Sequence, residues 1–205
     1  MALTPEARAS LQASIEAQDR LPIVRIPAII GGKKSEDVSV LYRTCTPVEI
    51  TPEGLNEART IVDEMTLVLK TYREITQTGR AFAANQIGID RMIVIFLHPD
   101  GTVFSYINPE ITWKSEERNI YWEVCMSGSP LGVDVVRPAS VKVHWYDLDG
   151  NEHHELLEGF DARRMQHEIE HKDGKVFYNT DGTVHSTLGY GLDKSAYMKQ
   201  ELRPV

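Results

Sequence analysis

The chain has 205 residues, of which 41% are hydrophobic and 25% are charged, and this composition is typical of a folded globular protein rather than a disordered one. Its 22 basic and 30 acidic side chains leave a net charge of −8, and no basic stripe that could neutralise phosphates is visible, which argues against DNA binding and general nucleic-acid binding. The longest apolar run, residues 92–97, is too short to span a bilayer, and an N-terminus with Glu6, Glu16 and Asp19 suits neither a secretory signal nor a transit peptide. We therefore expect a cytoplasmic protein with no membrane partner.

The first long element along the chain is a predicted amphipathic helix that begins after Thr51. Upstream of it, residues 3–19 predict a short polar helix, and prolines and glycines then break the chain into a surface arm. Thr51 followed by Pro52 is typical of a helix start, because threonine caps free backbone N–H groups and proline is tolerated at the first helical position. Apolar residues then recur every three or four positions and form one face: Leu55, Ala58, Val62, Met65, Leu69 and Tyr72. We expect this helix to end before Gly79.

Beyond residue 90 the pattern changes to strands. Three segments rich in β-branched and aromatic residues are predicted as strands: residues 91–97, 102–108 and 141–146. Residues 147–150 read Asp-Leu-Asp-Gly, a good hairpin turn in which Gly150 can adopt positive φ. A helix is then predicted from about residue 159 to beyond His171. This order indicates an α+β fold in which antiparallel β-sheets pack around a central helix that carries a His-Glu-x-x-His motif, with the long amphipathic helix preceding them.

The most informative stretch lies on that last helix, where the His-Glu-x-x-His motif occurs. Positions i and i+4 of a helix share a face, so His167 and His171 can present two imidazoles to one metal ion. Glu168 lies beside them, placed to take a proton from an activated water. The competing interpretation is a polar helix with two histidines on a solvated face. The adjacent pair His153-His154 is expected at the surface instead, because neighbours on a strand point to opposite faces.

A catalytic metal site needs a third protein ligand and leaves one position open for water. Downstream, His185 and Glu201 are candidates, although nothing in their surroundings marks them. The better candidate lies upstream at Cys125, because a thiolate is a strong ligand and lowers the net charge of the site. The chain's 2 cysteines do not make a disulfide framework, so either both are small buried packing residues or one of them does chemistry.

Three segments in this order resemble the signature of peptide deformylases, the metallohydrolases that remove the formyl group from the N-terminal methionine of new bacterial and organellar proteins. They are Gly-Arg-Ala-Phe-Ala-Ala-Asn-Gln at residues 79–86, Glu-Val-Cys-Met-Ser at 123–127 and Gln-His-Glu-Ile-Glu-His at 166–171. The likeness covers residues 38–180 and implies a catalytic domain there, with an N-terminal helix and arm at 1–37 and a C-terminal extension at 181–205. It also implies N-formylmethionyl peptides or nascent chains as substrates, and the ribosome as a candidate partner.

The resemblance assigns a metal centre and a general base. Cys125, His167 and His171 would be the ligands of one divalent metal ion, with Fe²⁺ as the expected ion and Ni²⁺, Co²⁺ or Zn²⁺ as alternatives. Glu168 would activate water and later protonate the leaving amine.

The resemblance also assigns groups that would contact the substrate. The side chain of Gln86 and the backbone N–H of Met126 would hold the developing oxyanion. Cys45 has no catalytic counterpart and is expected to be a packing residue. The implied substrate-binding residues are Gly79, Glu123, Val124 and Arg164.

Several positions depart from the family pattern. Val124 replaces a glycine, which is costly if the backbone there is left-handed. Arg164 stands three residues before His167, where the family has an apolar residue lining the methionine pocket, so the pocket either excludes its charged head or accepts a polar group. Glu170 replaces an aspartate that would help to orient a ligand histidine. Lys172 replaces a leucine, which predicts that this side of the helix is more exposed.

These departures leave three alternatives to an ordinary deformylase. The same amidase chemistry could act on a different N-acyl substrate. A catalytically silent homologue could bind N-terminal peptides, although an intact Glu168 and Gln86 speak against it. A metalloprotease with a downstream third ligand would keep its metal without Cys125.

Overall fold

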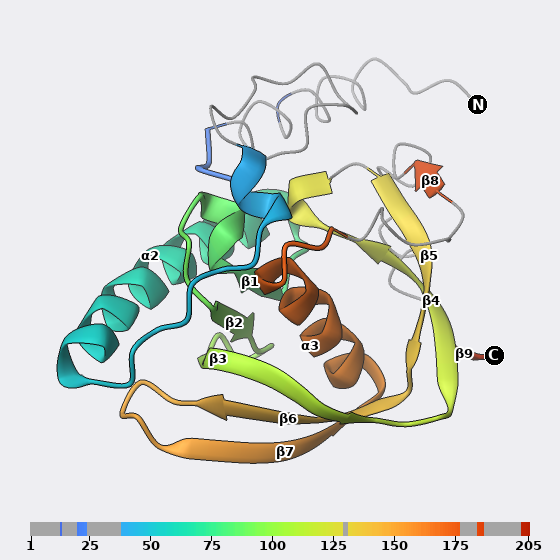
Figure 1. Ribbon diagram of the computed structural model, residues 1–205. Helices are drawn as coiled ribbons and strands as arrows, with labels where there is room; N and C mark the ends of the chain where they lie inside the picture. Colours follow the sequence, from blue (N-terminus) through green and yellow to red (C-terminus); the bar gives the residue numbers. More distant parts are fainter. Residues whose placement is uncertain (1–12, 14–19, 24–37, 129–130, 177–183, 187–201) are drawn as a thin grey trace.

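The computed structural model describes residues 13, 20–23, 38–128, 131–176, 184–186 and 202–205 (Figure 1). Apart from residue 13, the helix predicted at 3–19 lies outside the described residues, and so do most of the N-terminal arm and of the C-terminal extension. The described part contains two α-helices, two antiparallel sheets and three short 3-10 helices, which confirms the α+β class. Neither of these α-helices combines the length and apolarity that crossing a membrane requires.

The long helix α2 (Pro52–Thr76) begins where the sequence predicts. Thr51 has extended backbone angles (φ −126°, ψ 162°), and its Oγ1 accepts a hydrogen bond from the N–H of Gly54 at 3.2 Å. Leu55 is half-buried, and the rest of the predicted apolar face is buried: Ala58, Val62, Met65, Leu69 and Tyr72. The helix ends because Gln77 adopts the left-handed conformation (φ 58°) that closes a helix.

The larger sheet has five strands, and all neighbouring strands are antiparallel. In spatial order they are β1 (Ala81–Ala83), β2 (Ile93–Leu97), β3 (Val103–Lys114), β6 (Ser140–Tyr146) and β7 (Glu152–Glu158). Strands β2, β3 and β6 are the three that the sequence predicts. The predicted turn at residues 147–150 joins β6 to β7, with Gly150 at φ 81°.

The smaller sheet has four strands, and β4 and β5 form most of it. In spatial order they are β8 (Val184–Ser186), β5 (Leu131–Pro138), β4 (Arg118–Val124) and β9 (Arg203–Pro204). The indole of Trp122 on β4 fills the space over Gly132 on β5, where a Cβ would lie 2.2 Å from the ring. This close packing holds the end of β4, after which Cys125 and the 3-10 helix η3 (Met126–Gly128) follow.

Helix α3 (Gly159–Lys172) lies between the larger sheet and the β4–β5 pair, and α2 covers the other face of the larger sheet (Figure 1). The alternation of side chains along β2 produces this arrangement. Ile93 and Ile95 pack in a cluster with α2, whereas Val94 and Phe96 pack in a cluster with α3. Both faces of β2 are thus buried, and α3 is the central helix that the sequence predicts.

The C-terminal end of α3 is covered by residues that follow the 3-10 helix η1 (Val38–Tyr42). Thr44 and Asp173 form an isolated antiparallel bridge, and the N–H of Cys45 donates to the carbonyl of Lys172 at 2.7 Å. Lys172 is consequently only 6% exposed, and its Nζ pairs with Asp173 at 2.6 Å. The prediction that Lys172 marks a more exposed side of the helix is wrong.

Candidate metal centre

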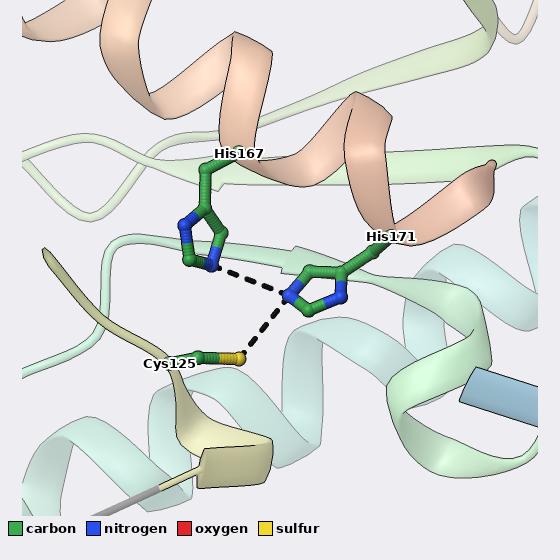
Figure 2. Close-up of side chains that lie close together, drawn as sticks. All are labelled: Cys125, His167 and His171. Atoms are coloured by element: carbon green, nitrogen blue, oxygen red, sulfur yellow. Dashed lines mark hydrogen bonds between the residues drawn. The ribbon is translucent and has the colours of Figure 1, made fainter. Parts of the chain in front are cut away.

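Three potential metal ligands from two separate segments meet beside α3 (Figure 2). Cys125 directly follows β4, whereas His167 and His171 lie about one turn apart on α3. The Nε2 atom of His171 lies 3.1 Å from Cys125 Sγ and 3.2 Å from His167 Nε2, and all three ligand atoms lie within 4.8 Å of one another. Ligand atoms around a tetrahedral metal are roughly 3.4 Å apart, since metal–ligand bonds measure about 2.0–2.3 Å. The three atoms are therefore nearly in position to share one ion.

The chemistry of this donor set fits a divalent transition metal. Cys125 is 3% exposed and His171 is 1% exposed, so both are shielded from water. One thiolate and two neutral imidazoles suit Fe²⁺, Co²⁺, Ni²⁺ and Zn²⁺, and three protein ligands leave a position open, as in catalytic sites. The alternative third ligands, His185 and Glu201, lie where the structure describes no side chain. The described residues therefore could hold a catalytic ion of any of these four kinds.

A buried carboxylate orients His167. The Oε2 atom of Glu123, on β4, lies 2.9 Å from Nδ1 of His167. With Nδ1 donating to this oxygen, the Nε2 lone pair is left facing Cys125 and His171. Glu123 is 6% exposed and both of its oxygens are engaged. The geometry thus gives the Glu123 side chain a positioning role, and contact of this residue with a substrate stays a prediction.

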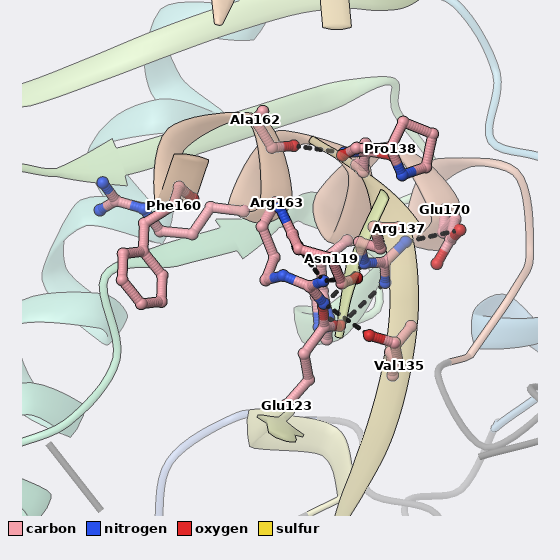
Figure 3. A network of polar contacts seen from close by, with 12 residues as sticks. Asn119, Glu123, Val135, Arg137, Pro138, Phe160, Ala162, Arg163 and Glu170 are labelled. Carbon is pink, nitrogen blue, oxygen red and sulfur yellow. Dashed lines mark hydrogen bonds and ion pairs between the residues drawn. The ribbon is translucent and has the colours of Figure 1, made fainter. Parts of the chain in front are cut away.

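Two arginines hold the Glu123 carboxylate (Figure 3). Arg137 donates to both oxygens, from Nε at 2.7 Å and from Nη2 at 2.9 Å, and Arg163 donates to Oε1. Burial alone would raise the pKa of Glu123, but the ion pair with Arg137 brings that pKa well below its usual range. The carboxylate therefore stays ionised and remains an acceptor for His167.

Arg163 is a site residue that sequence reasoning missed. Besides Glu123, it donates from Nη1 to the carbonyl of Val135 at 3.0 Å and from Nη2 to the carbonyl of Asn119 at 2.7 Å. Its guanidinium is consequently buried. The available signal was its position four residues before His167, since residues at this spacing share a helix face.

Glu168, the predicted general base, directly follows His167 on α3 and is buried. Burial raises the pKa of its carboxyl to about 7, where a group can both accept and donate a proton at neutral pH. Among the described residues, its buried Oε2 has no hydrogen-bond partner. One oxygen is therefore available to water or to a substrate.

The predicted oxyanion groups come close to the same sulfur. Gln86, on the 3-10 helix η2 (Ala84–Ile87), donates from Nε2 to Cys125 Sγ at 3.3 Å and to Ser127 Oγ at 3.2 Å. Its Oε1 accepts a backbone N–H at 2.9 Å, which holds the amide in place. Met126 directly follows Cys125 at the start of η3. The structure thus brings the Gln86 amide and the Met126 backbone to the sulfur side of the metal centre.

At two of the predicted substrate contacts, Gly79 and Val124, the backbone conformation determines which residue types fit. Gly79 has φ +82°, and a Cβ there would lie 3.0 Å from the ring of Tyr72, so the backbone itself favours glycine. Val124 ends β4, and the described non-glycine residues with positive φ are Gln77 and Asn108. The cost expected for a β-branched residue at position 124 therefore does not arise.

Two departures on α3 have partners other than those expected. Arg164 is paired with Asp161, and its guanidinium lies 5.5 Å from the ring centroid of Phe96. Glu170 accepts a hydrogen bond from Nη1 of Arg137 at 2.8 Å, so it supports the arginine that holds Glu123.

Known proteins of one family are similar to this chain in sequence and in fold. The family model for polypeptide deformylase matches residues 33–184, a range that includes every site residue that the resemblance assigns. A peptide deformylase from Zymomonas mobilis is 37% identical over 165 residues, which cover 77% of this chain and 83% of that protein. One from Afipia carboxidovorans is 47% identical over 141 residues, which cover 67% of this chain and 78% of that protein. The crystal structure of a probable peptide deformylase from synechococcus phage S-SSM7 has a TM-score of 0.65 at 28% identity, covering 78% of this chain and 98% of that one.

Proposed function

The chain belongs to the polypeptide deformylase family and is a hydrolase, and from this premise we propose that it removes the N-formyl group from the N-terminal methionine of nascent polypeptides. The observation that carries the proposal is the buried meeting of Cys125, His167 and His171 from two distant segments. A polar helix with two histidines on a solvated face would not bury these donors against a cysteine. The enzyme would work in the cytoplasm, with the ribosome as a candidate partner.

One divalent ion, Fe²⁺ in this proposal, would be held by Cys125, His167 and His171. When bound, it would supply the Lewis acidity that makes a water molecule nucleophilic at neutral pH. Ni²⁺, Co²⁺ and Zn²⁺ suit the same donors. Glu123 would keep Nε2 of His167 aimed at the ion, because it holds the opposite ring nitrogen at 2.9 Å.

Glu168 would carry the proton. It would accept a proton from the attacking water and then donate it to the amine nitrogen as the C–N bond breaks and formate leaves. Its burial directly after His167, and an Oε2 atom without a hydrogen-bond partner in the described part of the chain, support this role.

The Nε2–H group of Gln86 and the backbone N–H of Met126 would hold the oxygen of the formyl group as it gains negative charge. Such a donor contributes about 3–4 kcal/mol to the transition state. The short distances from Gln86 Nε2 to Cys125 and Ser127 support this placement. Gly79, Val124 and Arg164 would contact the substrate.

Formate release from a formyl-Met peptide tests the proposal, with protein loaded anaerobically with Fe²⁺ or with Ni²⁺. Turnover is expected, and Glu168→Gln should lower it by about 10²–10⁴-fold while the bound metal is retained. Glu155→Gln is the matched control, because Glu155 is exposed on β7. Full metal occupancy without formate release would overturn the proposal and favour a silent peptide-binding homologue.

A second candidate function is the same chemistry on a different N-acyl peptide, and Arg164 is the observation that favours it. Its guanidinium can pair with a carboxylate, as it does with Asp161. Formyl-Met and formyl-Glu peptides assayed side by side decide between the two substrates. A preference for formyl-Glu that Arg164→Met removes would support this candidate, whereas a strong preference for formyl-Met would exclude it.

A further inference from the structure

A second group of potential metal ligands lies on the β6–β7 hairpin, away from α3. His144 on β6 pairs directly with His154 on β7, and Glu152 pairs with Tyr146 further along the same two strands. Side chains of directly opposed residues share a sheet face, and so do residues two positions apart on one strand. His144, Glu152 and His154 therefore project from the same face of the hairpin.

Their ligand atoms are already close together. The Oε1 atom of Glu152 lies 2.8 Å from His144 Nε2 and 3.6 Å from His154 Nε2, and the three ligand atoms lie within 4.8 Å of one another. The imidazole rings are tilted by 32° with their centroids 4.9 Å apart. The 3.6 Å separation is near the roughly 3.4 Å expected between ligand atoms of a tetrahedral ion, and the 2.8 Å separation would have to widen by about 0.6 Å.

The surroundings of the His144 Nε2 atom suit a bound metal ion. Its Nε2 atom is buried, and within the described part of the chain it forms no hydrogen bond. The Glu152 Oε1 atom, 2.8 Å away, forms an ion pair with this nitrogen when the imidazole is protonated. A metal ion would satisfy both atoms at once.

The alternation along β6 explains why these donors face away from α3. Val141 and Val143 are buried in the cluster that packs against α3, so His144 lies on the opposite face of the sheet. His153, next to His154, lies on the α3 side, where it stacks on Trp145. The sequence correctly places His153 and His154 on opposite faces, but it does not show that the hairpin brings His144 to His154.

We propose that His144, Glu152 and His154 form a second divalent metal site that takes Zn²⁺ or another ion preferring nitrogen and oxygen ligands, such as Ni²⁺ or Cu²⁺. Two imidazoles and one carboxylate are a donor set that Zn²⁺ uses in proteins, and solvent can occupy the remaining position. Glu110 on β3, which pairs with His144 on its other side, adds a carboxylate to the same face. An ion here would tie the edge strand β7 to β6.

Zinc titration of the metal-free protein, monitored by calorimetry and elemental analysis after desalting, tests the number of sites. The intact chain should take up one more equivalent than His154→Ala, and His144→Asn should lose the same equivalent. His153→Ala is the matched control and should keep it, because this histidine faces the other way. Equal uptake by the intact chain and His154→Ala, or an equal loss in His153→Ala, would overturn the proposal.

Cobalt spectra separate this site from the metal centre beside α3. A thiolate bound to Co²⁺ gives a sulfur-to-metal charge-transfer band, which a site of nitrogen and oxygen ligands lacks. In Cys125→Ser the band should disappear, while the equivalent that depends on His154 remains. Loss of the His154-dependent equivalent in Cys125→Ser would contradict the hairpin site, and persistence of the band there would contradict the proposed metal centre instead.

Discussion

The described residues include two clusters of three potential metal ligands, one beside α3 and one on the β6–β7 hairpin, and the two differ mainly in what surrounds the ligands. In each, the ligand atoms lie within 4.8 Å of one another. In the α3 cluster, Cys125 and His171 are buried, and the half-buried His167 is held by Glu123. On the hairpin, the side chains of His154 and Glu152 are 68% and 55% exposed.

This difference in exposure shows that a buried ionised side chain needs charged neighbours. An ionised carboxylate taken out of water costs several kcal/mol unless it is paired, so Glu123 is found with Arg137 and Arg163 on its oxygens. The ionised Glu123 carboxylate in turn holds His167 in one orientation, with Nε2 facing His171. Close approach of the ligands is common to both clusters, whereas this orientation belongs to the buried one. We therefore expect the clusters to differ in affinity and in the rate of metal exchange.

The largest effect is expected when the thiolate is removed from the buried cluster. Cys125→Ser should lose the metal of the α3 cluster and lower formate release by more than about 100-fold, the upper range for losing a residue that merely supports a ligand. Elemental analysis and the formate assay measure both. If the variant kept its metal and its affinity unchanged, a downstream third ligand, as in the metalloprotease alternative, would replace Cys125 in the proposal.

Chelation should remove metal from the two clusters at different rates. A weak chelator should strip zinc from the hairpin about 10–100-fold faster than from the α3 cluster, because two of the three hairpin ligands, His154 and Glu152, are exposed to solvent. The kinetics should show two phases, with the fast phase missing in His154→Ala and the slow phase missing in Cys125→Ser. A single phase that survives in both variants would contradict the distinction between the clusters.

Arg163 and Arg164, adjacent on α3, test whether burial of an ion pair increases its contribution to stability. Arg163→Met should lower the free energy of unfolding by about 1–3 kcal/mol, because it leaves buried acceptors unpaired. Arg164→Met breaks a partly exposed pair with Asp161 and should cost less than about 1 kcal/mol. Urea unfolding of the metal-free protein measures both changes.

The same variants should differ in their metal centre. Arg163→Met should also weaken metal binding by about tenfold, and Arg163→Lys should restore part of it, since lysine keeps the charge without the guanidinium fork. Equal losses in the variants of Arg163 and Arg164 would show that the Glu123 network does not support the ligand.

The smallest effect is expected at the second cysteine. The pKa of the Cys45 thiol is raised to about 11, mainly by burial. The thiol therefore stays protonated at neutral pH and does not act as a thiolate ligand. Cys45→Ala should leave metal content and formate release unchanged and lower stability by about 1 kcal/mol. Loss of metal in this variant, measured beside Cys125→Ser, would contradict the assignment of Cys45 to packing.

Features that depend on spacing within one element are the ones that the sequence predicts well. The buried face of α2 and the shared face of His167 and His171 follow from helical periodicity, and the strands follow from β-branched runs. Lys172 was mispredicted because its burial depends on residues 43–45 crossing the end of α3. Arg163 was missed for the same reason, since its acceptors lie on the smaller sheet.

The hairpin cluster shows a second feature that residue spacing in the sequence does not predict. The turn at residues 147–150 is predictable, but only the observed register places His144 opposite His154. A register shifted by one residue would send every side chain of β7 to the other face. The folded sheet therefore determines which residues pair across strands, and the sequence pattern of either strand alone does not predict these pairs.

The origin of the α3 cluster in distant segments has a consequence for how the protein matures. Cys125 and His171 are 46 positions apart in the chain. A chain that has not been synthesised as far as His171 cannot assemble the proposed metal centre, and contacts between distant segments are slow to form because loop closure opposes them. Metal capture would therefore report completed folding, and the bound ion would stabilise the folded chain by an amount that grows with the logarithm of ion concentration. Metal scarcity would then shorten the lifetime of the polypeptide as well as silence its chemistry.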